Sequence, residues 1–92
     1  MIDSNMLFIG SLPWSTTEEE LMEELEKYGR VLTLRIVIQN DKNHPRYGKS
    51  MGFGFITMET VEDAQNVHKS MNNKPYKNRV IGIKRYVPRE SR

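Results

Sequence analysis

The spacing of apolar residues changes along the chain, and residues 16–29 have the spacing of an amphipathic helix. Thr17 and Glu20 are placed to form a capping box at its start, and Gly29 is expected to end it. The apolar stripe, at i, i+4 and i+7, consists of Leu21, Leu25 and Tyr28.

A second helix is predicted over residues 60–71, with Thr60 and Asp63 as its capping box. Its inward-facing residues are Ala64, Val67 and Met71. Residues 39–50 and 72–78 are polar, contain proline or glycine and have no periodicity, so both are predicted to be loops.

Four further segments are apolar or β-branched, with the alternation of strands. They are residues 6–12, 30–38, 51–58 and 79–86. The order strand, helix, strand, strand, helix, strand predicts an α+β fold, the ferredoxin-like βαββαβ sandwich. This fold has a four-stranded antiparallel sheet with both helices on one face, which leaves the other face open.

The length of 92 residues suits one small domain. We expect that domain over residues 6–87, after an N-terminal lead of residues 1–5 and before a tail or linker of residues 88–92. An apolar content of 37% with 28% charged residues is typical of a globular chain, and no segment approaches the roughly 20 apolar residues of a membrane span. The absence of cysteine excludes disulfides and thiolate zinc sites.

Charge is distributed unevenly, although the net charge is only +2. Residues 1–29 contain seven acids and one base, whereas residues 69–92 contain eight bases and one acid. This asymmetry indicates a dipolar surface with a basic side that suits phosphates, although solvated helix and strand faces would give the same pattern.

The segment Gly48-Lys49-Ser50 ends like a phosphate-binding loop, which has the pattern G-x-x-x-x-G-K-[ST]. That pattern needs a glycine at position 43, where the chain has Asn43, and a helix after the loop. A strand is predicted instead, and Gly52-x-Gly54 lacks the third glycine of a dinucleotide fingerprint. The sequence therefore argues against a nucleotide-binding loop.

Alternation in residues 51–58 places Phe53 and Phe55 on the open face of the sheet. Gly52 and Gly54 face the helices, where they are expected to allow close packing. Phe8 points outward from the neighbouring first strand by the same parity. Exposed phenylalanines forgo roughly 1.5–3 kcal/mol of burial each, which is tolerated when a partner stacks on them. Three rings on a flat sheet suit unstacked bases.

With these rings in place, the chain resembles an RNA recognition motif domain from Met6 to about Tyr86. The two signature segments of that family match "LFIGSL" and "MGFGFITM", and the flanking "LPWSTTEEEL" and "VEDAQNV" are similar as well. The resemblance implies a module for single-stranded RNA that stacks bases on Phe8, Phe53 and Phe55. The chain departs from the family at Met51, because that position usually holds a lysine or arginine that contacts phosphate.

Several further residues are predicted to contact RNA. Arg35 and Lys84 lie on the open face by parity, as do Val37, Val80 and Gly82. Where the chain leaves the sheet, such domains often extend their binding surface. The remaining candidates are Met51, Arg85, Tyr86 and the loop residues Arg46, Tyr47 and Lys49. Trp14 is either a further stacking ring or a hydrophobic lid, and packing is favoured.

The alternative function is peptide binding, because the chain also resembles splicing-factor homology domains of the same fold. Those domains have an acidic first helix and an Arg-x-Phe motif, to which Lys74-Pro75-Tyr76 is a near match. The corresponding residues are Lys74, Tyr76 and Glu23. A third outcome combines RNA on the sheet with a protein partner on the acidic helices, where Met22 is expected to be exposed.

No set of residues indicates catalysis or a metal site, and no cofactor is expected. His44 and His68 have no companion ligands in the sequence, and the glutamates of the first helix suit a solvated face. We therefore expect a monomeric, non-enzymatic domain that binds single-stranded RNA. Its expected location is the nucleus or the cytoplasm, with the nucleus slightly favoured.

Overall fold

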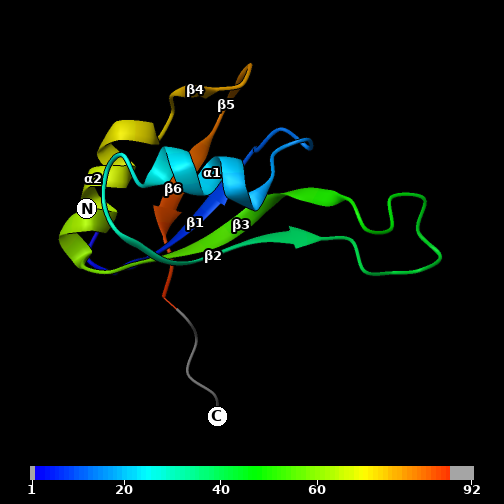
Figure 1. The fold of residues 1–92 in the computed structure, drawn as a ribbon, viewed down its shortest axis with the longest axis horizontal. Helices are drawn as coiled ribbons and strands as arrows, with labels where there is room; N and C mark the ends of the chain where they lie inside the picture. Colours follow the sequence, from blue (N-terminus) through cyan, green and yellow to red (C-terminus); the bar gives the residue numbers. More distant parts are fainter. Residues whose placement is uncertain (1, 88–92) are drawn as a thin grey trace, which may run out of the picture.

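The computed structural model describes residues 2–87 and has the predicted order of elements (Figure 1). The main sheet is antiparallel with strand order β2-β3-β1-β6, and α1 and α2 lie on the same face of it. The elements are β1 (Met6–Gly10), α1 (Glu18–Leu25), β2 (Val31–Ile38), β3 (Ser50–Met58), α2 (Val61–Met71), β4 (Pro75–Tyr76), β5 (Arg79–Val80) and β6 (Gly82–Arg85). The ferredoxin-like α+β fold is thus confirmed.

The predicted last strand, residues 79–86, is divided. Its first two residues, Arg79–Val80, pair with Pro75–Tyr76 in a separate hairpin, so residues 72–78 are not entirely loop. The two residues of the turn, Lys77 and Asn78, both have positive φ, at 51° and 78°. Such a pair of angles is what a tight two-residue hairpin turn requires. Val80 therefore belongs to the hairpin and lies outside the main sheet.

The capping box at the start of α1 is confirmed. The Glu20 amide donates to the Thr17 hydroxyl, and the Thr17 amide donates to the Glu20 carboxylate. The helix ends at Leu25, earlier than predicted, and a turn leads on to Gly29. Gly29 serves a close approach to α2, because an added Cβ would lie 2.7 Å from Cβ of Asp63.

The capping box predicted for α2 is half right. The Thr60 hydroxyl accepts from the amide of Asp63, as expected. The Asp63 carboxylate, however, accepts from the Arg30 amide at 3.4 Å, beside Gly29. Asp63 therefore joins α2 to the start of β2.

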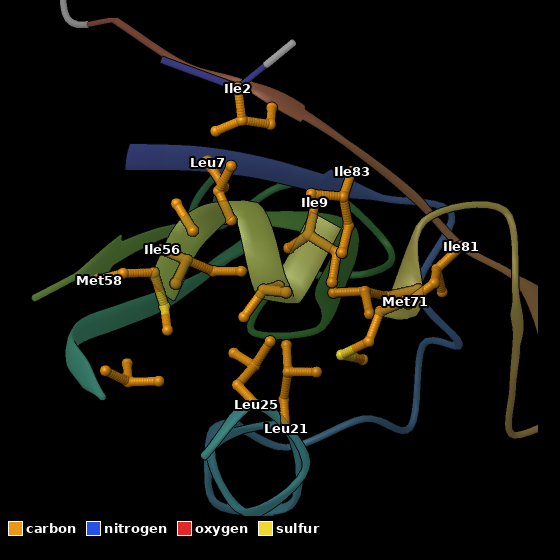
Figure 2. Close-up of a cluster of buried hydrophobic side chains, with 14 of the residues drawn as sticks. Ile2, Leu7, Ile9, Leu21, Leu25, Ile56, Met58, Met71, Ile81 and Ile83 are labelled. Atoms are coloured by element: carbon orange, nitrogen blue, oxygen red, sulfur yellow. The ribbon is translucent and has the colours of Figure 1, made fainter. Parts of the chain in front are cut away.

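The hydrophobic core lies between the sheet and the two helices (Figure 2). Leu7, Ile9 and Ile83 point from the strands toward the helices, and Leu21 and Leu25 point back from α1. Full burial of such a side chain contributes about 1.5–3 kcal/mol. The inward-facing residues predicted for α2, Ala64, Val67 and Met71, are also buried, as are Ile56 and Met58 of β3.

The N-terminal lead predicted for residues 1–5 packs on the domain over residues 2–5. Ile2 is only 6% exposed, and its carbonyl accepts from the side-chain amide of Gln65 at 2.8 Å. The Asn5 side chain donates to the carbonyl of Met58 at 2.9 Å. The tail predicted for residues 88–92 lies outside the described residues. Between residues 2 and 87, no helix is long and apolar enough to cross a membrane.

Candidate nucleic-acid interface

One row of paired residues crosses all four strands of the main sheet. Arg35 on β2 pairs with Phe55 on β3, Phe55 with Phe8 on β1, and Phe8 with Lys84 on β6. Directly paired residues of antiparallel strands point to the same face. The neighbouring residues Leu7 and Ile56 are buried toward the helices, so this row faces away from them. The predicted parity of these four residues is confirmed.

Four aromatic rings gather on this open face. The ring of Phe8 lies 5.7 Å from that of Phe53 and 5.7 Å from that of Phe55, between centroids. Phe53 and Phe55 are 6.3 Å apart, and Tyr86 adds a fourth ring 4.8 Å from Phe55. We call Phe8, Phe53, Phe55 and Tyr86 the aromatic face. All four are half-buried, so part of each ring is accessible.

Tyr86 is fixed by the N-terminal segment. Its amide donates to the carbonyl of Met6 at 3.0 Å, and its carbonyl accepts from the Ser4 hydroxyl at 2.9 Å. These bonds continue the line of β6 beyond its last paired residue. The sequence contained no signal for the contribution of Ser4.

Two paired glycines, Gly10 and Gly82, keep the sheet flat beside Phe8. A Cβ on Gly10 would lie 3.0 Å from Cε2 of Phe8, which shows that the ring extends over this residue. A Cβ on Gly82 would meet nothing within 4 Å, so the surface there is open. Gly82 thus lies on the open face, as its parity predicted.

The glycines of β3 do not serve the helices, and that prediction was wrong. A Cβ on Gly54 would lie 2.4 Å from the Arg35 carbonyl oxygen, so this glycine makes room for the backbone of β2. Gly52 has a φ of +84° and lies against Trp14, whose Nε1 would be 3.3 Å from an added Cβ. Pairing between β2 and β3 is shifted here, so strict alternation does not extend to the exposed Met51.

The basic residues fall into two groups. Lys84 Nζ lies 5.9 Å from the centroid of Phe8, and Arg35 is exposed at the other end of the same row. Arg85 pairs with Leu7, which places it on the helix side of the sheet, and it forms an ion pair with Asp3. Arg85 is thus separated from the aromatic face, contrary to its predicted place beside Tyr86.

The long loop between β2 and β3 is fastened at its base. The guanidinium of Arg46 stacks over Trp14, with Cζ 3.7 Å from the ring centroid, and donates to the Ser50 carbonyl at 2.9 Å. This is a cation–π contact, whose strength depends on how far the charge is desolvated. Trp14 is 63% exposed, so its predicted role as a packing residue was wrong.

Lys49 lies at the same end of the sheet. It lines a hollow of about 430 Å³ together with Trp14, Ile36 and residues 15–19 at the start of α1. Because Ile36 is buried toward the helices, this hollow opens on the helix side of the sheet edge. Lys49 is therefore less close to the aromatic face than its sequence position suggested.

The three residues of the peptide-binding alternative are not brought together. Tyr76 packs partly against the core, and burial raises the pKa of its phenol, with the Glu20 carboxylate adding to that effect. Glu20 is already paired with Lys77 at 2.9 Å. Glu23 lines a groove on the β2 side of α1, and Lys74 is exposed on the hairpin side.

The histidines do not form a metal site. The ring of His44 accepts the Arg46 amide within the β2–β3 loop at 3.0 Å, and His68 is half-buried on α2. Over the described part of the chain, no three histidine, cysteine, aspartate or glutamate residues gather where they could hold a metal ion.

A four-stranded antiparallel sheet with aromatic rings on its open face and two helices behind it defines a class of small binding domains. Within that class, the chain belongs to the RNA recognition motif family, whose sequence model matches residues 7–82. This membership confirms the resemblance seen in the two signature segments.

Similar proteins include nuclear polyadenylated RNA-binding protein 4 of Saccharomyces cerevisiae, 39% identical over 88 residues, which cover 96% of this chain and 15% of that protein. Glycine-rich RNA-binding protein RZ1B of Arabidopsis thaliana is 31% identical over 83 residues, which cover 90% of this chain and 27% of that protein. The chain thus spans 27% or less of the length of these two relatives.

Solved structures with the same fold include RNA Binding Protein PG1, with a TM-score of 0.80 and 28% identity over 96% of this chain and 100% of that one. The Rna15 RRM with bound RNA (GU) has a TM-score of 0.78 and 22% identity over 92% of this chain and 85% of that one. At this identity, the second likeness shows the fold alone.

Proposed function

We propose that this domain binds single-stranded RNA on its aromatic face. The observation that carries the proposal is the set of four accessible rings on the sheet face opposite the helices, with centroids 4.8–6.3 Å from a neighbour. Each base stacked on an aromatic side chain contributes about 1–3 kcal/mol by alanine substitution. Membership of the family and the RNA-binding relatives support the same function.

In this proposal, the two cations of the central row contact the RNA beside the rings. Arg35 and Lys84 lie at opposite ends of the row that contains Phe55 and Phe8, so a strand crossing the rings would meet both. A bound base has room over Gly82 because the surface there is open. Met51, exposed near the start of β3, would supply an apolar contact where the family usually has a basic residue.

Trp14 extends the proposed surface at the loop end of the sheet. Its ring lies against Gly52, directly before Phe53, and one face is covered by Arg46. A base that leaves the sheet beyond Phe53 would stack on the exposed Trp14 at the sheet edge, with the guanidinium of Arg46 close to a phosphate. Arg46 and Lys49 would then act at this end of the RNA rather than over its centre.

The test is a titration with a degenerate pool of short single-stranded RNA, followed by backbone amide shifts. We expect shifts centred on the aromatic face. Phe53→Ala should weaken binding by about 1–3 kcal/mol, roughly 5- to 150-fold. Val61→Ala, on the exposed start of α2, is the control and should leave the affinity unchanged. An unmoved sheet face, or equal losses in both variants, would count against the proposal.

Because Trp14 is the one tryptophan of the chain, its fluorescence reports on the loop end of the surface separately. Quenching that saturates at the same RNA concentration as the amide shifts would support stacking there. The monomeric state and the nuclear location stay predictions.

A further inference from the structure

A groove runs between α1 and β2 on the helix side of the molecule. Its cavity has a volume of about 600 Å³ and is lined by Glu18, Glu19, Met22, Glu23 and Leu34. Met22 and Leu34 are partly buried and pack against the core, so they form an apolar floor. The prediction that Met22 is exposed among glutamates is therefore only partly right.

Four of the six glutamates in residues 18–26 have a partner within the domain. Glu20 pairs with Lys77, and Glu24 pairs with Lys27 at 3.0 Å. Glu18 and Glu26 accept from backbone amides of β2. The Ile36 amide donates to Glu18 at 2.9 Å, and the Val31 amide donates to Glu26 at 3.0 Å.

The other two glutamates, Glu19 and Glu23, have no hydrogen bond or ion pair among the contacts described for residues 2–87. They are four residues apart, so they lie on one side of α1, and both border the groove. Like charges at this spacing destabilise a helix, and the last turn of α1 has no basic residue to offset them. Lys27, just beyond the helix, is close enough to Glu23 for their charges to interact, but its ammonium group pairs with Glu24. The two carboxylates thus provide a negative rim beside an apolar floor.

We propose that this groove, formed by Glu19, Glu23, Met22 and Leu34, binds a segment of a partner protein in which lysine or arginine flanks an apolar side chain. The apolar side chain would enter between Met22 and Leu34, and the basic side chains would face the two glutamates. Charge complementarity selects this occupant, because a nucleic acid would be repelled by the same carboxylates. The groove faces away from the aromatic face, so partner protein and RNA bind at the same time.

The test uses three short blocked peptides and amide shifts of the labelled domain. The first has leucine between lysines, the second replaces leucine by serine, and the third replaces the lysines by glutamate. Only the first should shift Glu19, Met22, Glu23 and Leu34 at millimolar concentration. The double change Glu19→Gln with Glu23→Gln should weaken its binding by about three- to tenfold, whereas Glu62→Gln on α2 should not.

Equal shifts with the serine peptide would reduce the site to nonspecific charge attraction and overturn the proposal. So would an absence of shifts in the groove, or displacement of the peptide by the degenerate RNA pool. Shifts in the same residues on raising the concentration of the domain itself would assign the groove to a second copy instead. Because the two glutamates are exposed, their replacement leaves the fold intact.

Discussion

Two glycines, Gly54 and Gly82, help to shape the aromatic face beside its rings. Gly54 lies between Phe53 and Phe55 on β3, where the Arg35 carbonyl of β2 occupies the place of a Cβ. The close approach of β2 to β3 therefore depends on this position. Gly82, on the far side of Phe8, has no such neighbour.

This difference predicts that replacement by alanine destabilises the domain at Gly54 and has little effect at Gly82. Gly54→Ala should lower the free energy of unfolding by about 1–3 kcal/mol, because the methyl group and the β2 backbone must move apart. Gly82→Ala should leave it nearly unchanged. Urea denaturation of both variants measures the difference, and equal stabilities would show that β2 yields without cost.

Alternation along the strands was enough to predict that Arg35, Phe55, Phe8 and Lys84 share the open face, but their pairing in one row required the register of the sheet. Alternation could not predict Arg46 on Trp14, because 32 positions separate them in the sequence and only the loop geometry brings them together. The place of Arg85 is a different failure: its parity already assigned it to the helix side, but the position at the end of the strand was given more weight.

At the level of elements, α1 is tied to the β4–β5 hairpin by one carboxylate. Glu20 accepts from the Thr17 amide and from the ammonium group of Lys77. The bond from Lys77, followed by that from Thr17, lowers the pKa of Glu20 below its ordinary value of 4.5. The hairpin itself was not predicted, because Lys-Asn is a weaker turn signal than Asn-Gly.

The sign of this pKa change sets a pH dependence. A carboxylate with a lowered pKa in the folded state stabilises the fold above pH 4.5, and this contribution is lost as the pH falls through the folded-state pKa. Glu20→Gln should therefore destabilise the domain at neutral pH and have less effect well below pH 4.5. Urea denaturation at both pH values checks this, with Glu62→Gln as control. A pH-independent difference would contradict it.

The Thr17 cap gives a second prediction at this level. Thr17→Ala removes the acceptor for the Glu20 amide and should cost about 0.5–2 kcal/mol of stability. Thr17→Ser keeps the acceptor and should cost less. RNA affinity should be unchanged in both, because α1 lies on the face opposite the rings. A large loss of affinity with intact folding would contradict this separation.

Across the whole molecule, RNA and acidic groups occupy opposite faces in our proposals. The central row provides two cations, Arg35 and Lys84, whereas Arg85 is held by Asp3 on the helix side. Fewer phosphate contacts are thus available than the count of basic residues in the sequence suggests. The sign of the asymmetry followed from the sequence, but the ion pair that holds Arg85 on Asp3 could be found only in the folded structure.

The dependence of RNA affinity on salt concentration measures the number of phosphate contacts. Each phosphate contact contributes a slope of about −0.7 to the logarithm of affinity against the logarithm of salt concentration, so the two cations of the row give about −1.4, and contacts from Arg46 and Lys49 would add to it. Lys84→Gln should reduce the slope by about 0.7, whereas Lys69→Gln on the exposed surface of α2 should not change it. A slope near zero would argue against both cations of the row.

The outer strands of the sheet, β2 and β6, carry a feature with a consequence for solubility. Two amides of β2 donate to Glu18 and Glu26 at the two ends of α1, and the Ile83 amide of β6 donates to the side chain of Asn72 at 2.8 Å. Unpaired edge amides are where sheets recruit further strands and begin to aggregate. Both edges here are closed at these amides by side chains of the same domain. These side chains therefore hinder the addition of a strand from a second copy at either edge of the sheet.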